Sequence, residues 1–148
     1  MTDTDTGELT ITRTHDAPPE LVFDCMTTPE HLTHFWGPKG TTTPVDRIVV
    51  DLRPGGAFET SMVNDGDGNE HTMKAVYVEV ERPTRLVWEE PGGMRTTVTF
   101  ADLGDGRTEV TTHQTNVPAW YLAPEARAGF ESSLDRCDAY VKRLVAAG

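Results

Sequence analysis

The segment "DLRPGGAFETSM", residues 51–62, carries the clearest signal for the fold. Pro54 suits the second position of a type II turn, and Gly55 suits the third, where φ is positive. The turn divides residues 44–63 into two segments. We therefore interpret residues 44–63 as two antiparallel strands joined at the turn.

Downstream of this hairpin, four further strand segments follow at short intervals. They are "HTMKAVYVEVERP" (71–83), "TRLVWEEP" (84–91), "MRTTVTFAD" (94–102) and "TEVTTHQTN" (108–116). The links between them are short and rich in glycine, such as "NDGDGN" (64–69), which is typical of hairpins. Residues 44–116 therefore predict an antiparallel meander of six strands.

Upstream of residue 44, the spacing of apolar residues first predicts a strand and then two helices. In "ELTITRTH" (8–15), Leu9 and Ile11 alternate with threonines, which predicts a first strand. In "APPELVFDCMT" (17–27), Leu21, Val22, Cys25 and Met26 share one helical face after two prolines that suit a helix start. A second short helix is predicted over residues 29–35, because Gly37 and Pro38 must end it.

The C-terminal residues 122–147 predict the longest helix. Apolar residues recur there at steps of three and four, which makes one apolar face: Ala126, Phe130, Leu134, Cys137, Val141 and Leu144. We expect this face to be buried opposite Trp88 and Phe58, and Glu131, Arg136 and Lys142 to face water. The element order predicts an α+β fold of about seven strands, one before and six after two short helices, with the long helix covering one face of the sheet.

Three motifs carry a family resemblance. "FWGPKG" (35–40), "DLRPGGAFETSM" (51–62) and "VEVERPTRLVWEE" (78–90) resemble the branch of the START-like (SRPBCC) superfamily named after the C-terminal domain of the heat-shock-protein ATPase activator. The similarity covers nearly the whole chain from Glu8. It implies a helix-grip fold, in which a curved sheet wraps the C-terminal helix and leaves a cavity between them. Residues 1–7 are then expected to be a disordered tail, and residues 8–148 a single domain.

Composition excludes several classes of partner. The 148 residues suit one core, and 24 acidic against 13 basic residues give a net charge of −11, which disfavours nucleic acid and membrane surfaces. No apolar run reaches the roughly 20 residues of a membrane helix. The first ten residues lack the pattern of a secretory signal, so we expect a cytoplasmic protein, monomeric or homodimeric, with Cys25 and Cys137 as buried thiols.

Motifs for metal or cofactor chemistry are missing from the sequence. His31 and His34 could share a helix face, but no recognisable ligand set completes them. "DGDGNEH" (65–71) resembles a calcium loop, yet Glu70 and Val76 stand where such a loop needs glycine and a bidentate acid. The sequence also contains neither a nucleophile elbow nor a phosphate-binding loop. We therefore predict no metal and no cofactor.

What remains is a pocket between sheet and helix. The expected ligand-binding residues are the large apolar side chains that such a pocket would expose: Phe35, Trp36, Phe58, Met62, Met73, Tyr77, Trp88 and Phe130. Trp36 either closes one end of the core or roofs the pocket mouth, with Gly37 and Gly40 as pivots and Lys39 at the rim. The polar groups that could face the pocket are Glu59, His71, Glu90, Arg95 and His113.

Three functions stay open. The first is binding of a small apolar or aromatic molecule. The second is an enzyme of the cyclase or dehydratase type that uses a pocket histidine or carboxylate. The third is interaction with a chaperone, which is weakened because we expect a free-standing domain without the N-terminal half of such activators. Two or more polar groups converging within hydrogen-bond reach would favour the enzyme, and one or none would favour binding.

Overall fold

The computed structural model describes residues 6–147, which form one antiparallel sheet of eight strands and three α-helices. The elements, in chain order, are β1 (Thr6–His15), α1 (Pro19–Thr27), α2 (Pro29–Leu32), β2 (Thr41–Thr42), the 3₁₀ turn η2 (Val45–Arg47), β3 (Val49–Val50), β4 (Ala57–Asn64), β5 (Glu70–Glu81), β6 (Arg85–Glu89), β7 (Arg95–Gly104), β8 (Arg107–Pro118), the 3₁₀ turn η3 (Ala119–Leu122) and α3 (Pro124–Ala147).

The strand order confirms the predicted α+β helix-grip fold. It runs β1-β8-β7-β6-β5-β4-β2, and β3 also pairs with β4. All seven predicted strands are present, and β2 is an additional strand of two residues. β3 is shorter than predicted, because residues 45–47 form a 3₁₀ turn after Pro44.

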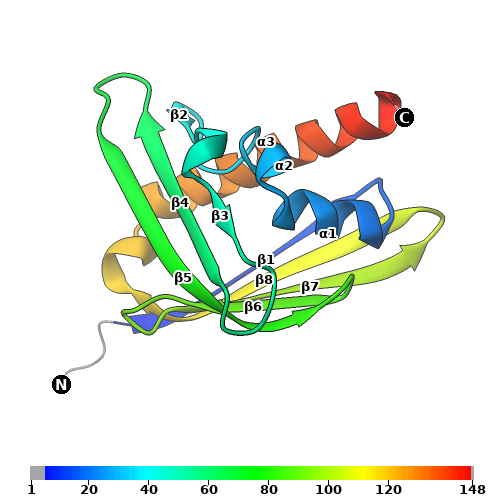
Figure 1. Ribbon diagram of the computed structural model, residues 1–148, viewed down its shortest axis with the longest axis horizontal. Helices are drawn as coiled ribbons and strands as arrows, with labels where there is room; N and C mark the ends of the chain where they lie inside the picture. Colours follow the sequence, from blue (N-terminus) through cyan, green and yellow to red (C-terminus); the bar gives the residue numbers. More distant parts are fainter. Residues whose placement is uncertain (1–5, 148) are drawn as a thin grey trace.

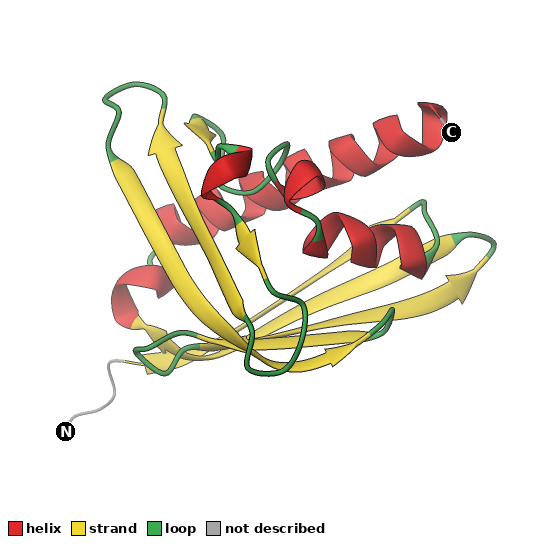
Figure 2. Cartoon of the chain, viewed as in Figure 1, coloured by secondary structure: helices red, strands yellow, loops and turns green. Residues whose placement is uncertain are grey.

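The sheet is sharply curved, and this curvature creates the space in which α3 lies. Figures 1 and 2 show β4 and β5 rising at a steep angle from β6, β7, β8 and β1, with α3 crossing the concave side. The β5–β6 pairing shifts register between Tyr77 and Glu79. Such an irregularity bends a strand and increases its twist.

The turn at Pro54 has the predicted geometry. Gly55 has a φ of 86°, and the Gly56 amide donates to the Arg53 carbonyl at 2.8 Å, which closes the turn. Two backbone hydrogen bonds, at 2.8 and 2.9 Å, tie Gly55 and Gly56 to Tyr77 of β5. A Cβ at Gly56 would lie 2.0 Å from the Asp51 carbonyl oxygen, so the second glycine is required by close approach of the backbone.

The core joins α1 and the C-terminal half of α3 to the sheet. Phe23 of α1 is fully buried and meets Phe100 of β7 edge to face, with 5.3 Å between the ring centroids. On α3, the buried residues are Cys137, Tyr140 and Val141. Both Cys25 and Cys137 are free, buried thiols, as predicted.

Three boundaries differ from the sequence prediction. β1 begins at Thr6, so residues 6 and 7 of the expected tail belong to a strand, and residues 1–5 lie outside the described residues. α2 ends at Leu32 and is followed by turns, because the chain already bends toward the Gly37–Pro38 corner. α3 begins two residues after Leu122, behind the 3₁₀ turn η3.

None of the helices within residues 6–147 combines the length and the apolar character that a membrane crossing requires.

Candidate functional site

A cavity of about 590 Å³ lies between the concave face of the sheet and the N-terminal half of α3. Met26 of α1 and residues 35–38 after α2 close one side, β4 to β8 supply the floor, and Ala126, Phe130 and Leu134 of α3 form the roof. The volume lies within the range of pockets that hold small molecules.

Six of the eight residues expected at a pocket line this cavity: Phe35, Trp36, Met62, Met73, Trp88 and Phe130. Phe58 and Tyr77 lie elsewhere, fully buried in the core. Their rings stack with centroids 5.3 Å apart, and Phe58 meets Trp88 edge to face at 5.0 Å. They therefore support the tryptophan from behind, and contribute no surface to the cavity.

Trp36 is a fixed part of the cavity wall. Its indole Nε1 donates to Thr60 Oγ1 at 3.0 Å, and Thr43 Oγ1 donates to its carbonyl oxygen at 2.8 Å. The indole also packs edge to face on Phe58, at 5.3 Å between centroids. The Trp36 side chain therefore combines features of both expected roles. It packs on the core with one face, and it borders the cavity with another.

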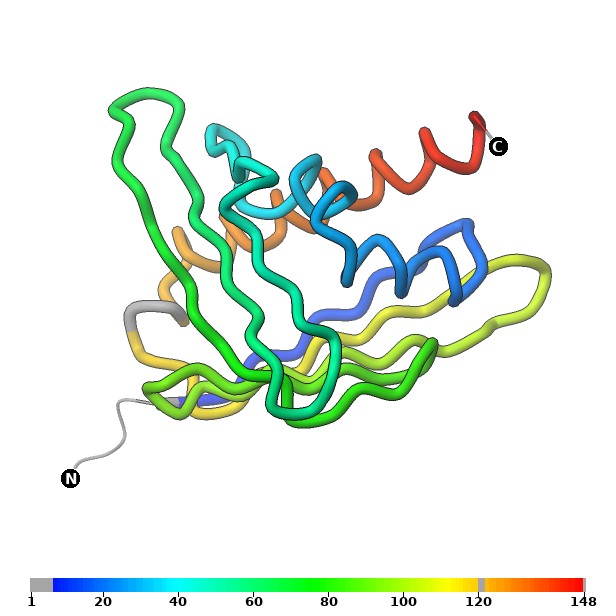
Figure 3. The backbone as a smooth tube through the Cα atoms, viewed as in Figure 1, coloured from blue at the N-terminus to red at the C-terminus, as the bar shows by residue number. Residues whose placement is uncertain are grey.

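The corner after Trp36 is anchored to α3, and Figure 3 shows this segment running beside the helix. The Arg136 guanidinium donates through Nη1 to the carbonyl oxygens of Gly37 at 2.8 Å, Pro38 at 3.0 Å and Thr41 at 3.3 Å. The expectation that Arg136 faces water was therefore wrong. A charged donor on several carbonyls holds the corner where the sequence analysis expected pivots.

Two serines of α3 complete this anchor. Ser133 Oγ accepts from the Gly37 amide at 3.2 Å and donates to the Phe35 carbonyl at 3.1 Å, while Ser132 Oγ accepts from the Lys39 amide. The Lys39 side chain is exposed and is not among the described residues that line the cavity, so it does not occupy the expected rim position.

Methionine is concentrated at this cavity. Four of the five methionines of the chain line it: Met26, Met62, Met73 and Met94. Methionine side chains are flexible and polarizable, and they adapt to aromatic and irregular apolar ligands. The cavity wall is therefore suited to apolar ligands of more than one shape.

Polar side chains gather on β7 and β8. Thr96, Thr112 and Gln114 line the cavity and are buried. Gln114 Nε2 donates to Thr96 Oγ1 at 3.2 Å, but Gln114 Oε1 is buried without a hydrogen-bond partner. A buried amide oxygen without a partner is costly and is satisfied when a donor enters.

Of the five polar candidates from the sequence, His71 and Glu90 line the cavity. Burial raises the pKa of the Glu90 carboxyl group. The other three, Glu59, Arg95 and His113, are not among its described lining residues. Arg95 pairs with Glu89 at 3.0 Å, and His113 pairs with Glu8 at 3.0 Å.

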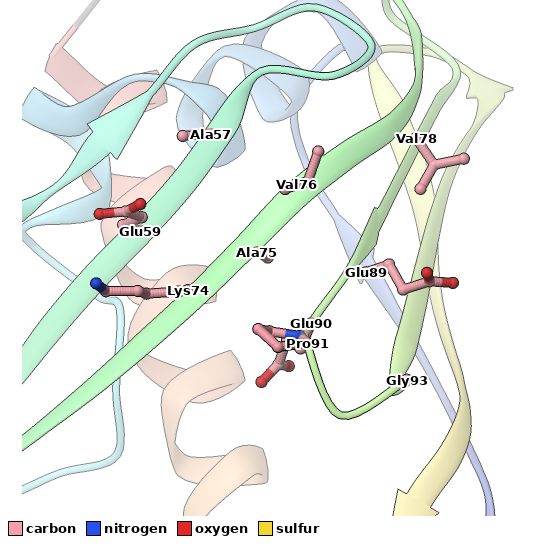
Figure 4. A pocket seen from close by; sticks show the side chains of 10 residues that line it. All are labelled: Ala57, Glu59, Lys74, Ala75, Val76, Val78, Glu89, Glu90, Pro91 and Gly93. Carbon is pink, nitrogen blue, oxygen red and sulfur yellow. The ribbon is translucent and has the colours of Figure 1, made fainter.

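Glu90 also borders a second, shallower pocket of about 400 Å³ beside the outer face of β4 and β5, shown in Figure 4. β5 pairs with β6 only from Val76 onward, so its first residues extend past the end of β6. Glu90 lies where the two strands part. In Figure 4 the side chains of Glu89 and Glu90 extend in different directions from this strand end.

Sequence reasoning missed Met26, Met94, Thr96, Gln114 and Leu134 as cavity residues. Gln114 had an available signal, because it follows Val110 and Thr112 at steps of two and so shares their face of β8. Met94 had none, since it lies in the β6–β7 turn, whose position over the cavity depends on the bend of the sheet.

The histidines considered as metal ligands have other contacts. His31 Nδ1 lies 2.5 Å from the Tyr140 hydroxyl oxygen, and the His34 ring stacks on Tyr140 with centroids 4.8 Å apart. In the described part of the chain, no three His, Cys, Asp or Glu side chains gather as a metal site would require.

Comparison with known proteins places the chain in a family. The family model described as activator of Hsp90 ATPase homolog 1-like protein matches residues 16–142. The chain belongs to this AHSA1-like family. No curated protein matches the chain significantly.

Solved structures similar to this AHSA1-like protein cover almost its full length. A crystal structure of a protein from Chromobacterium violaceum is 26% identical, with a TM-score of 0.81 over 90% of this chain and 96% of the other. One from Nitrosomonas europaea is 25% identical, with a TM-score of 0.81 over 98% and 99% of the two chains. An AHSA1-like protein from Aeromonas hydrophila, solved by NMR, is 22% identical, with a TM-score of 0.77 over 92% and 94%.

These matches support the START-like fold of the AHSA1-like family, which is a ligand-binding fold in general.

Proposed function

We propose that the protein binds a small apolar or aromatic molecule in the cavity between the sheet and α3. The cavity itself is the observation that carries the proposal: about 590 Å³, with Trp36, Trp88 and Phe130 in its wall and four methionines around them. A void of this size lined by such side chains loses packing contacts that an apolar guest restores.

The enzyme of cyclase or dehydratase type is the less favoured alternative. The hydrogen-bonded pair among the described cavity residues is Gln114 with Thr96, and neither side chain titrates near neutral pH. His71 and Glu90 both border the cavity, but no hydrogen bond or ion pair joins them within residues 6–147. General acid–base catalysis needs such groups within hydrogen-bond reach of the reacting atoms.

A chaperone-interacting role is the alternative that the family description suggests. Such a role does not require an internal cavity. The apolar space beneath α3 therefore favours ligand binding.

The test of this proposal is a substitution on α3 that places a larger side chain in the cavity. Ala126 lines it, whereas Ala128, two positions along the same helix, is exposed. Nile red, a neutral dye that fluoresces in apolar surroundings, should bind saturably to the wild type and to Ala128→Phe. Ala126→Phe should weaken its binding at least about tenfold, because the added ring occupies the space of the guest.

Urea unfolding of both variants serves as the control for folding. Absence of saturable binding to the wild type, or equal binding by the folded Ala126→Phe variant, would contradict the proposal.

A further inference from the structure

The cavity has an uneven distribution of charge. Among its described lining residues, the charged side chains are the carboxylates Glu90 and Glu125, and His71 is the remaining titratable group; neither lysine nor arginine is among them. The chain as a whole carries a net charge of −11. A carboxylate on a ligand would therefore be repelled by these two carboxylates, and no lysine or arginine among the described lining residues would offset the repulsion.

The acceptor groups lie in neighbouring rows of the cavity floor. Trp88 pairs with Thr96, and Thr96 pairs with Gln114, so these three residues form a row across β6, β7 and β8. Glu90 is two residues beyond Trp88, and its amide donates to the Met94 carbonyl at 2.9 Å. Glu90 therefore belongs to the next row along the sheet, and it borders the same cavity as Gln114, which lies two strands away on β8.

Both groups are acceptors without a partner in the described part of the chain. Gln114 is 5% exposed, and its Oε1 has no hydrogen-bond partner. The Glu90 carboxylate makes no hydrogen bond or ion pair with any other residue in the range 6–147, and burial raises its pKa. A cation beside this carboxylate would offset the cost of its desolvation.

We propose that the ligand is an apolar or aromatic amine, whose protonated amino group donates to the Glu90 carboxylate and to Gln114 Oε1. This inference rests on the proposed function. An ammonium group has donors only, and a carboxylate and an amide oxygen are acceptors. The rings and methionines described above would hold the apolar part of the same molecule.

The experiment compares three probes of one shape, 2-naphthylmethylamine, 2-naphthylmethanol and 2-naphthoate, by displacement of Nile red at pH 7. The amine should bind best and the acid worst. We expect at least about a tenfold difference between amine and acid, because charge-assisted hydrogen bonds exceed neutral ones and like charges repel.

Variants identify the groups responsible. Glu90→Gln should reduce the ratio of amine to alcohol affinity about tenfold, with both affinities measured against the Nile red affinity of the same variant. Glu89→Gln is the matched control, since it removes the same charge from the same strand end, and Glu89 pairs with Arg95 and is not among the cavity residues. Gln114→Leu should weaken both the amine and the alcohol relative to the Nile red affinity of the same variant.

The possible failures are distinguishable. If Nile red and all three probes fail to bind, the proposed function is wrong. If they bind but the acid matches or exceeds the amine, or if Glu90→Gln and Glu89→Gln behave alike, the amine proposal is wrong and ligand binding stands.

Discussion

At the scale of single residues, His15 joins β1 to α3. It is 3% exposed, and its Nδ1 lies 3.5 Å from Asp138 Oδ1, a distance too long for a hydrogen bond of normal strength. Burial lowers the pKa of His15; the nearby carboxylate of Asp138 opposes this shift, and Arg13 adds to it. Burial therefore favours the neutral form of this imidazole in the folded protein.

The consequence is a dependence of stability on pH. Between the lowered pKa of folded His15 and its ordinary value of about 6.5, the unfolded chain binds a proton that the folded protein does not, so stability falls as the pH falls. The free energy of unfolding in urea should decrease from about pH 7.5 to about pH 5.5, and less so in His15→Gln.

His113→Gln is the control for this prediction, because His113 is only half-buried and pairs with Glu8. Equal pH dependence in the wild type and in His15→Gln would show that His15 does not titrate differently in the folded protein.

At the scale of elements, α3 has two halves with different surroundings. In the C-terminal half, Cys137 and Val141 are buried against the core, as the apolar periodicity predicted. In the N-terminal half, Phe130 is only half-buried and lines the cavity, because the curved sheet diverges from the helix there. The apolar periodicity is the same in both halves of α3, but only the C-terminal half packs against the core.

Two truncations should reveal this difference. Val141→Ala should cost about 2 kcal/mol of unfolding free energy, since it removes two methyl groups from a fully packed site. Phe130→Ala should cost less than about 2 kcal/mol, well below the 3–5 kcal/mol of a buried aromatic residue. Urea unfolding measures both, and a cost above about 3 kcal/mol for Phe130→Ala would show that the ring is packed in the core.

At the scale of the whole molecule, the cavity couples ligand binding to stability. A ligand that binds only the folded state at 100 times its dissociation constant adds about 2.7 kcal/mol. Under such conditions 2-naphthylmethanol should raise the melting temperature of the wild type and of Ala128→Phe in differential scanning calorimetry. Ala126→Phe should show no comparable rise, and a rise of equal size would place the binding site outside the cavity.

Several features of this protein were determined by the sequence alone. The turn at Pro54 and Gly55, the hairpin links and the helical periodicity of residues 122–147 are local, because they depend on φ preferences and on which side chains share a face. These patterns, with the three family motifs, were enough for the strand order along the chain and for the helix-grip fold. They also indicated six of the aromatic and methionine residues around the cavity.

The tertiary structure decided which of those residues border empty space. Phe58 and Trp88 are both buried aromatic residues of strands, yet only Trp88 reaches the cavity, because Phe58 packs behind it in the core. Arg136 and Gln114 are polar residues whose roles depend on a distant loop and on a neighbouring strand. Periodicity reports the direction of a side chain from its own backbone, whereas a cavity arises where two elements distant in sequence fail to meet.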